Sequence, residues 1–193
     1  MLFRIDDGQW AEDDGSAWHY GPDNTPTQKG PLSVTLLRDG PRVVLVGGDI
    51  LVGEEVALEL EKVLPESKQA RRVAHVRGPQ PAMEPRPPML QLLGLDEVRL
   101  SQESIRYDQQ GRPSFKRPYI LDPSYKVREP NICKIRNNGV TVVSDEIKDL
   151  LLQFEPKLWF EAVCYEGEEA PDLPKPPPFR IPTMDELLGG SKR

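Results

Sequence analysis

The chain has 193 residues, a formal net charge of -6 and 37% hydrophobic residues. This length fits one domain with or without a tail, and the hydrophobic content excludes wholesale disorder. The acidic balance argues against nucleic-acid binding, which uses a basic surface. The start MLFRIDDGQW resembles no leader, and no apolar run reaches the roughly 18 residues of a membrane span, so we expect a cytoplasmic protein without membrane contact.

The opening segment, residues 6–23, combines carboxylates and aromatic residues with turn formers, which predicts a loop-rich surface region. Aromatic anchors beside acidic side chains are typical of a surface that binds a basic protein. The alternative is that the tryptophans close over the core. The candidate partner-binding residues here are Asp6, Asp7, Trp10, Glu12, Asp13, Asp14 and Trp18.

A strand-to-helix unit follows. Residues 32–36 alternate apolar with polar, and Val43–Val46 is an unbroken apolar run that predicts a buried strand. After Gly53, apolar residues recur at helical spacing until Pro65 ends the helix. These apolar residues are Val56, Leu60, Val63 and Leu64.

The same order returns near the carboxyl end. Residues 140–143 predict a short strand, Ser144 is a plausible N-cap, and residues 145–155 predict a helix that Pro156 ends. The apolar stripe of this helix is Ile147, Leu150, Leu151 and Phe154, which we assign to the core.

The two units align without gaps. Residues 48–65 and 139–156 share a glycine at the start, a valine, a glutamate, a leucine and the final proline. This likeness indicates either an old duplication of one segment or the same local strand-to-helix structure used twice without common origin.

Proline-rich residues 78–88 predict a surface loop, and further strands are expected around 98–107 and 159–165. We expect a single α+β domain over residues 1–165, with a mostly antiparallel sheet packed against two main helices. Residues 166–193 predict an extended, proline-rich acidic tail. Its first carboxylates complete the predicted partner surface, and they are Glu166, Glu168 and Glu169.

The sequence gives little support for a catalytic site. The two histidines, His19 and His75, lie beside no evident nucleophile, and the two cysteines, Cys133 and Cys164, are better placed as strand or core residues. No glycine-rich phosphate loop occurs, so we expect no cofactor. One enzyme alternative stays open, a metal-dependent hydrolase or nuclease that uses Asp122, Glu146 and Lys148.

Residues 139–151 (GVTVVSDEIKDLL), followed by Phe160 and Val163, resemble the C-terminal signature of the eleventh polymorphic-toxin immunity family. In that family an apolar strand runs through Val-Ser-Glu/Asp-Glu-Ile-Lys into an amphipathic helix and then a Phe-x-x-Val strand. Residues 111–113, 121–124 and 134–136 also resemble the family's spacing, and residues 3–7 are a looser match. Members often carry an aromatic residue where this chain has Asn137-Asn138. The resemblance covers about residues 99–165.

The resemblance implies a non-enzymatic immunity protein without catalytic residues, which binds and neutralises a cognate antibacterial toxin or secreted effector in the cytoplasm. The acidic composition adds that a basic toxin would be attracted electrostatically. A third alternative is an adaptor or chaperone that holds a secreted cargo protein through the proline-rich tail.

Overall fold

The computed structural model describes 1–5, 11–13, 18–20, 26–28, 33–36, 42–46, 48–64, 71–77, 89–94, 96–128 and 130–169. For β2, β3, β4, β8 and most of β5 the description covers the backbone alone. The predicted proline-rich loop at 78–88 and the tail from residue 170 onward lie outside these ranges.

The first half of the described chain contains eight strands and one helix. In order they are β1 (Leu2–Ile5), β2 (Ala11–Asp13), β3 (Trp18–Tyr20), β4 (Pro26–Gln28), β5 (Ser33–Leu36), β6 (Val43–Val46), β7 (Asp49–Val52), α1 (Glu54–Val63) and β8 (Arg71–Arg77).

The second half repeats this order and adds two short 3-10 turns. It contains β9 (Met89–Leu92), β10 (Asp96–Val98), η2 (Gln102–Ser104), β11 (Ile105–Tyr107), β12 (Pro113–Phe115), β13 (Ile120–Leu121), η3 (Pro123–Tyr125), β14 (Ile132–Ile135), β15 (Thr141–Ser144), α2 (Asp145–Phe154) and β16 (Phe160–Tyr165). The two halves therefore form two structural repeats, which we call repeat 1 (β1 to β8) and repeat 2 (β9 to β16).

Strand register supports this correspondence. In the ribbon of β3 and β4, Tyr20 pairs with Pro26, and in the ribbon of β11 and β12 Tyr107 pairs with Pro113, 87 positions further along. Helices α1 and α2 have the same length of 10 residues and begin 91 positions apart. Agreement over ribbons, strands and helices favours a duplicated unit over one local solution used twice.

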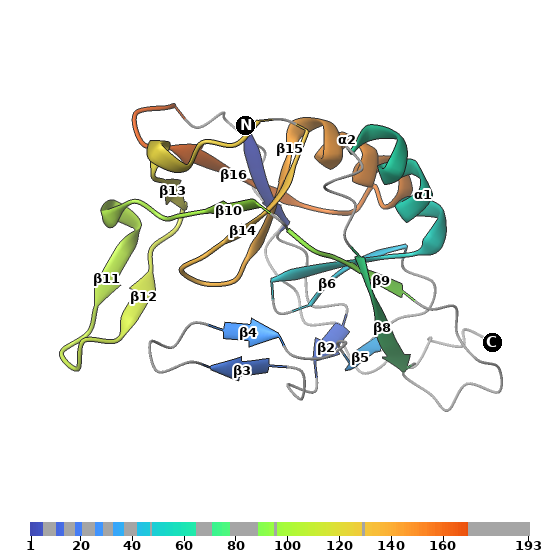
Figure 1. Cartoon of the computed structure of the whole chain (residues 1–193), viewed down its shortest axis with the longest axis horizontal. Coiled ribbons are helices and arrows are strands. Elements are labelled where there is room, and N and C mark those ends of the chain that lie inside the picture. Colours follow the sequence, from blue (N-terminus) through green and yellow to red (C-terminus); the bar gives the residue numbers. More distant parts are fainter. Residues whose placement is uncertain are drawn as a thin grey trace, which may run out of the picture.

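The repeats exchange their first strands. Strand β9, which opens repeat 2, pairs antiparallel with β7 and β8 of repeat 1. Strand β1, which opens repeat 1, pairs antiparallel with β15 and β16 of repeat 2. Each six-stranded sheet is thus completed by a strand from the other repeat (Figure 1).

Both six-stranded sheets are mixed and curve into nearly closed barrels. The first has the order β2-β5-β8-β9-β7-β6, and its end strands β2 and β6 lie against each other. The second has the order β10-β14-β15-β1-β16-β13, and Leu100, just after β10, bridges Leu121 of β13.

The α+β class is confirmed, but the expectation of a mostly antiparallel sheet needs correction. Strand β5 pairs parallel with β8, β13 with β16, and β10 with β14. Parallel partners must be joined by a crossover, and α1 and α2 lie within two of these crossovers. Alternation along a strand shows only its faces, so it could not predict these directions.

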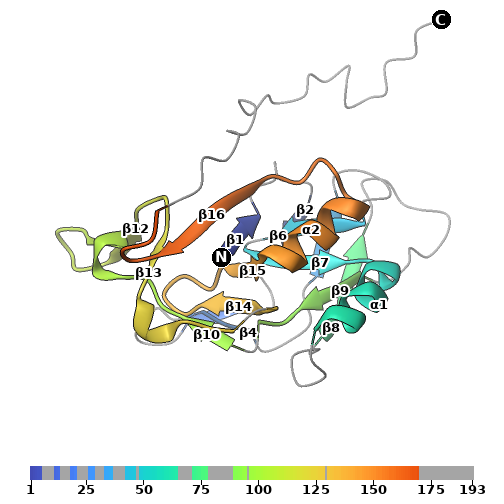
Figure 2. The ribbon, with the colours of Figure 1, turned by 90° about the horizontal axis from the view of Figure 1, so that it is seen from above.

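A shared core lies between the barrels and the helices. Val56 and Leu60 of α1 and Ile147 and Leu151 of α2 are buried in one cluster, with Phe3 of β1 among its other members. The helices pack against each other on the same side of the molecule (Figure 2). The other members of the two predicted stripes are buried or pack partly buried against the same cluster, so both stripes face the core, as the sequence predicted for α2.

Ser144 occupies the N-cap position of α2, as the sequence predicted. Its buried hydroxyl makes no capping bond, however, and instead accepts a hydrogen bond from the N–H of Asn131 at 3.0 Å. The opening segment, predicted to be loop-rich, also contains the short strands β2 and β3, which pair with the later strands β5 and β4. Such pairing depends on distant segments, which local turn signals do not register.

Candidate functional site

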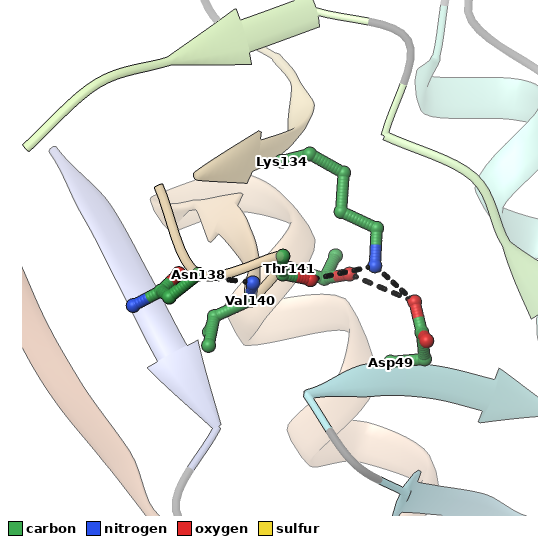
Figure 3. Close-up of polar contacts among 6 residues, drawn as sticks. Asp49, Lys134, Asn138, Val140 and Thr141 are labelled. Carbon is green, nitrogen blue, oxygen red and sulfur yellow. Dashed lines mark hydrogen bonds and ion pairs between the residues drawn. The ribbon is translucent and has the colours of Figure 1, made fainter. Parts of the chain in front are cut away.

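A buried ion pair joins the two repeats. Lys134 of β14 donates hydrogen bonds to the Asp49 carboxylate of β7 and, at 2.9 Å, to the carbonyl oxygen of Gly139. The Asp49 side chain is 0% exposed and that of Lys134 is 21% exposed. Figure 3 shows the two side chains facing each other from opposite repeats, with Thr141 beside them. The hydroxyl of Thr141 donates to Asp49 at 3.5 Å.

Burial raises the pKa of the Asp49 carboxyl, while the charge and hydrogen bond of Lys134 oppose this rise. Hydrogen bonds from Gln91 and Thr141 also favour the carboxylate. A desolvated charge is costly to separate from its counter-charge. The pair therefore holds the two repeats in register, and the sequence alone gave no sign that these residues meet.

The backbone makes an equally close contact beside this pair. The N–H of Thr141 donates to the carbonyl oxygen of Gly48 at 2.7 Å. Gly48 has a φ of +94°, and a Cβ atom there would lie 3.3 Å from the Cα of Val140. Only glycine combines this dihedral angle with such an approach. Asn138 shapes the adjacent turn, because its Oδ1 accepts from the N–H of Val140 at 3.1 Å (Figure 3).

The predicted acidic residues at the end of β16 form an exposed turn, which we call the acidic turn (Glu166–Glu169). Its backbone is fixed by a hydrogen bond from the N–H of Glu166 to the carbonyl oxygen of Leu121 at 2.8 Å. Glu168 forms an ion pair with Lys126 at 2.7 Å, and the hydrogen bond in this pair lowers the pKa of Glu168. The turn therefore presents Glu166 and Glu169 to solvent from a fixed backbone.

The ribbon of β11 and β12 projects from the same end of the molecule, which Figures 1 and 2 both show. We call residues 105–117 the arm. Its base is tied to β13, since the N–H of Ile120 donates to the hydroxyl of Ser104 at 2.8 Å. The N–H of Lys116 donates to the carbonyl oxygen of Ser104 at 2.9 Å. Because β13 also carries Leu121, the arm and the acidic turn share one support.

The predicted cluster in the opening segment is described only in part. Glu12 and Asp13 lie in β2 and Trp18 lies in β3, each with its backbone alone described. The other members, Asp6, Asp7, Trp10 and Asp14, lie outside the described residues. Their role in partner binding stays a prediction.

The three residues of the hydrolase alternative lie in separate places. Asp122 accepts a hydrogen bond from the N–H of Ser124 at 2.9 Å, and this bond lowers the pKa of Asp122. Glu146 and Lys148 lie in α2, and Figures 1 and 2 both place α2 away from β13, which Asp122 follows.

Lys148 is held within its own helix. Its ammonium group lies 2.5 Å from an oxygen of Asp145 and 4.2 Å from the ring centroid of Phe3. Burial acts to lower the pKa of Lys148, but the hydrogen bonds and charges of Asp145 and Asp149 together outweigh burial and raise it. The structure therefore does not assemble Asp122, Glu146 and Lys148 into one site.

Cys133 and Cys164 are free and buried in β14 and β16, as the sequence predicted. Burial raises the pKa of the Cys164 thiol, which makes it a poor nucleophile. Within the described ranges, no group of three or more His, Cys, Asp or Glu side chains is placed to hold a metal ion. No helix in these ranges is long and apolar enough to cross a membrane.

Comparison of the sequence with protein-family models gives no match, and comparison with curated proteins gives no significant match either.

Proposed function

We propose that the chain is a non-enzymatic immunity protein that binds a cognate antibacterial toxin in the cytoplasm and neutralises it. The observation that carries the proposal is the acidic turn, the part of the predicted partner surface whose side chains are described. Glu166 and Glu169 are exposed, and the backbone beneath them is hydrogen-bonded to β13. A turn whose backbone is already ordered loses little backbone freedom on binding, which favours a specific partner.

Charge supports the same proposal. The net charge of -6 attracts a basic toxin over a distance, and the acidic turn supplies a local target for its lysines or arginines. Tyr165, at the end of β16, is buried beneath this turn and accepts a hydrogen bond from the N–H of Val127 at 3.2 Å. Its hydroxyl therefore helps to keep the surface in one shape.

The proposal is tested with the protein encoded by the adjacent reading frame. We expect that protein to co-purify with the full chain, and its toxicity to be suppressed when both are produced together. Replacing Glu166 and Glu169 with lysine should slow association several-fold at low salt, because exposed charges act mainly on the association rate. Glu54→Lys, on the exposed start of α1, is the matched control and should leave the rate unchanged. Absence of binding by the unaltered chain would remove the proposal.

A further inference from the structure

The arm is an exposed feature of the molecule and has the opposite charge to the whole chain. Every residue from 106 to 114 is exposed. Residues 105–117 contain four basic side chains and one acidic side chain, a net charge of +3 in a protein of net charge -6. Such segregation of charge onto a projecting ribbon gives the arm its own electrostatic preference, which is for an acidic surface.

The tip of the arm is shaped before any partner arrives. The Asp108 carboxylate accepts hydrogen bonds from the N–H groups of Gln110 and Arg112 at 2.8 and 2.9 Å. The Arg112 guanidinium donates to the other Asp108 oxygen at 2.8 Å. These bonds lower the pKa of Asp108, and the bond from the Arg112 backbone is the largest cause. Gly111 supplies the positive φ of +75° that closes the turn.

The base of the arm is anchored in the second core cluster, where Ile105 and Phe115 pack against buried residues. A two-stranded ribbon alone is marginally stable in water, so this anchor and the bonded tip are what hold it out from the body. An arm fixed at both ends pays little conformational entropy when it enters a cleft.

The arm exposes a large aromatic residue, Tyr107. The residue is 63% exposed, which makes it the most exposed large hydrophobic residue of the described chain. Arg106 adjoins it in β11, and in the described part of the molecule Arg106 pairs with no carboxylate. Tyrosine and arginine are the residue types that dominate binding energy at protein interfaces, because each adds large contact area and a directional polar group.

From this arrangement we propose that the arm inserts into a carboxylate-lined cleft of the toxin, with Tyr107 as its anchor and Arg106 and Lys116 paired with the acidic groups. This inference rests on the proposed function and adds that contact is two-sided. The acidic turn meets basic groups of the toxin, while the arm occupies an acidic cleft. An arm in such a cleft excludes the toxin's substrate.

The test measures binding of the adjacent-frame protein to the full chain and its variants by surface plasmon resonance. Tyr107→Ala should weaken binding at least about 30-fold, the size expected for an interface anchor. Arg106→Glu should weaken binding further at low salt than at high salt, because it places a like charge against the cleft. Leu58→Ala on α1 and Lys157→Glu are the matched apolar and charge controls, and neither should change the affinity.

The outcomes separate the two proposals. If Tyr107→Ala and Arg106→Glu both bind the adjacent-frame protein as tightly as the unaltered chain, the proposed binding role of the arm is overturned. The proposed immunity function then remains in place. No binding by the unaltered chain overturns both. A duplex DNA probe of about 20 base pairs is included, since exposed basic residues can also bind phosphates. If the chain binds the DNA and Arg106→Glu abolishes that binding, the proposal that the arm binds an acidic cleft of a protein is overturned. Circular dichroism of each variant confirms that the fold is retained.

Discussion

Replacing Lys134 with methionine would leave the Asp49 carboxylate buried without its counter-charge. The variant keeps most of the apolar volume of the lysine chain and removes the ammonium group that faces Asp49. Since Asp49 is 0% exposed, water cannot replace the lost partner without opening the contact between the repeats. We therefore expect a large loss of folding stability at neutral pH.

The loss of folding free energy in Lys134→Met is limited because Asp49 can become protonated. Protonating a carboxyl with an ordinary pKa of 3.8 costs about 1.4 kcal/mol for each pH unit above that value. The unpaired carboxyl can therefore lower the free energy of unfolding by at most about 4 kcal/mol at pH 7 and about 1.6 kcal/mol at pH 5. Loss of the hydrogen bond to Gly139 adds about 1 kcal/mol at both pH values.

The sign of the pH dependence follows from linkage. Burial raises the pKa of Asp49, so the folded state binds more protons than the unfolded state between 3.8 and the raised value. Stability from this group consequently falls as pH rises through that window. Without Lys134 the pKa rises further and the window widens, so the stability loss caused by Lys134→Met should be larger at pH 7 than at pH 5, by at most about 3 kcal/mol.

Urea unfolding at the two pH values measures this difference. The double variant Asp49→Asn with Lys134→Met has no buried carboxyl, so its own free energy of unfolding should carry no contribution from this site to the difference between pH 5 and pH 7. Lys157→Met removes an exposed ammonium group and should be neutral within about 0.5 kcal/mol. A loss below about 1 kcal/mol at pH 7, or an equal loss at both pH values, would refute the assigned role of the pair.

Three further outcomes are expected. Deleting residues 1–5 should abolish the cooperative thermal transition, and a peptide of residues 1–8 should restore it; a normal transition without the peptide would contradict the strand exchange. Gly48→Ala should cost about 1 to 2 kcal/mol in urea unfolding and more than Gly111→Ala, whose added Cβ has open space, because Gly48 also approaches Val140. Leu151→Ala should cost about 2 to 5 kcal/mol and Leu58→Ala less than about 0.5, since only Leu151 is buried; equal losses would place the core elsewhere.

The sequence by itself determined the local elements. Apolar residues at helical spacing identified α1 and α2, and Pro65 and Pro156 marked where each helix could not continue. The run Val43–Val46 identified β6. These features depend on residues close together in the chain, so spacing alone is sufficient to recognise them. The likeness of residues 48–65 and 139–156 also pointed to the repeat.

Only the tertiary structure decided which strands pair and which charges meet. Every strand offers the same backbone donors and acceptors, so nothing in β1 or β9 specifies a partner in the other repeat. Asp49 and Lys134 are 85 positions apart and carry no local mark of their pairing. Tyr107 is exposed and Phe115 is half-buried because the arm extends away from the barrel at these residues. Only the packed molecule shows where this extension begins.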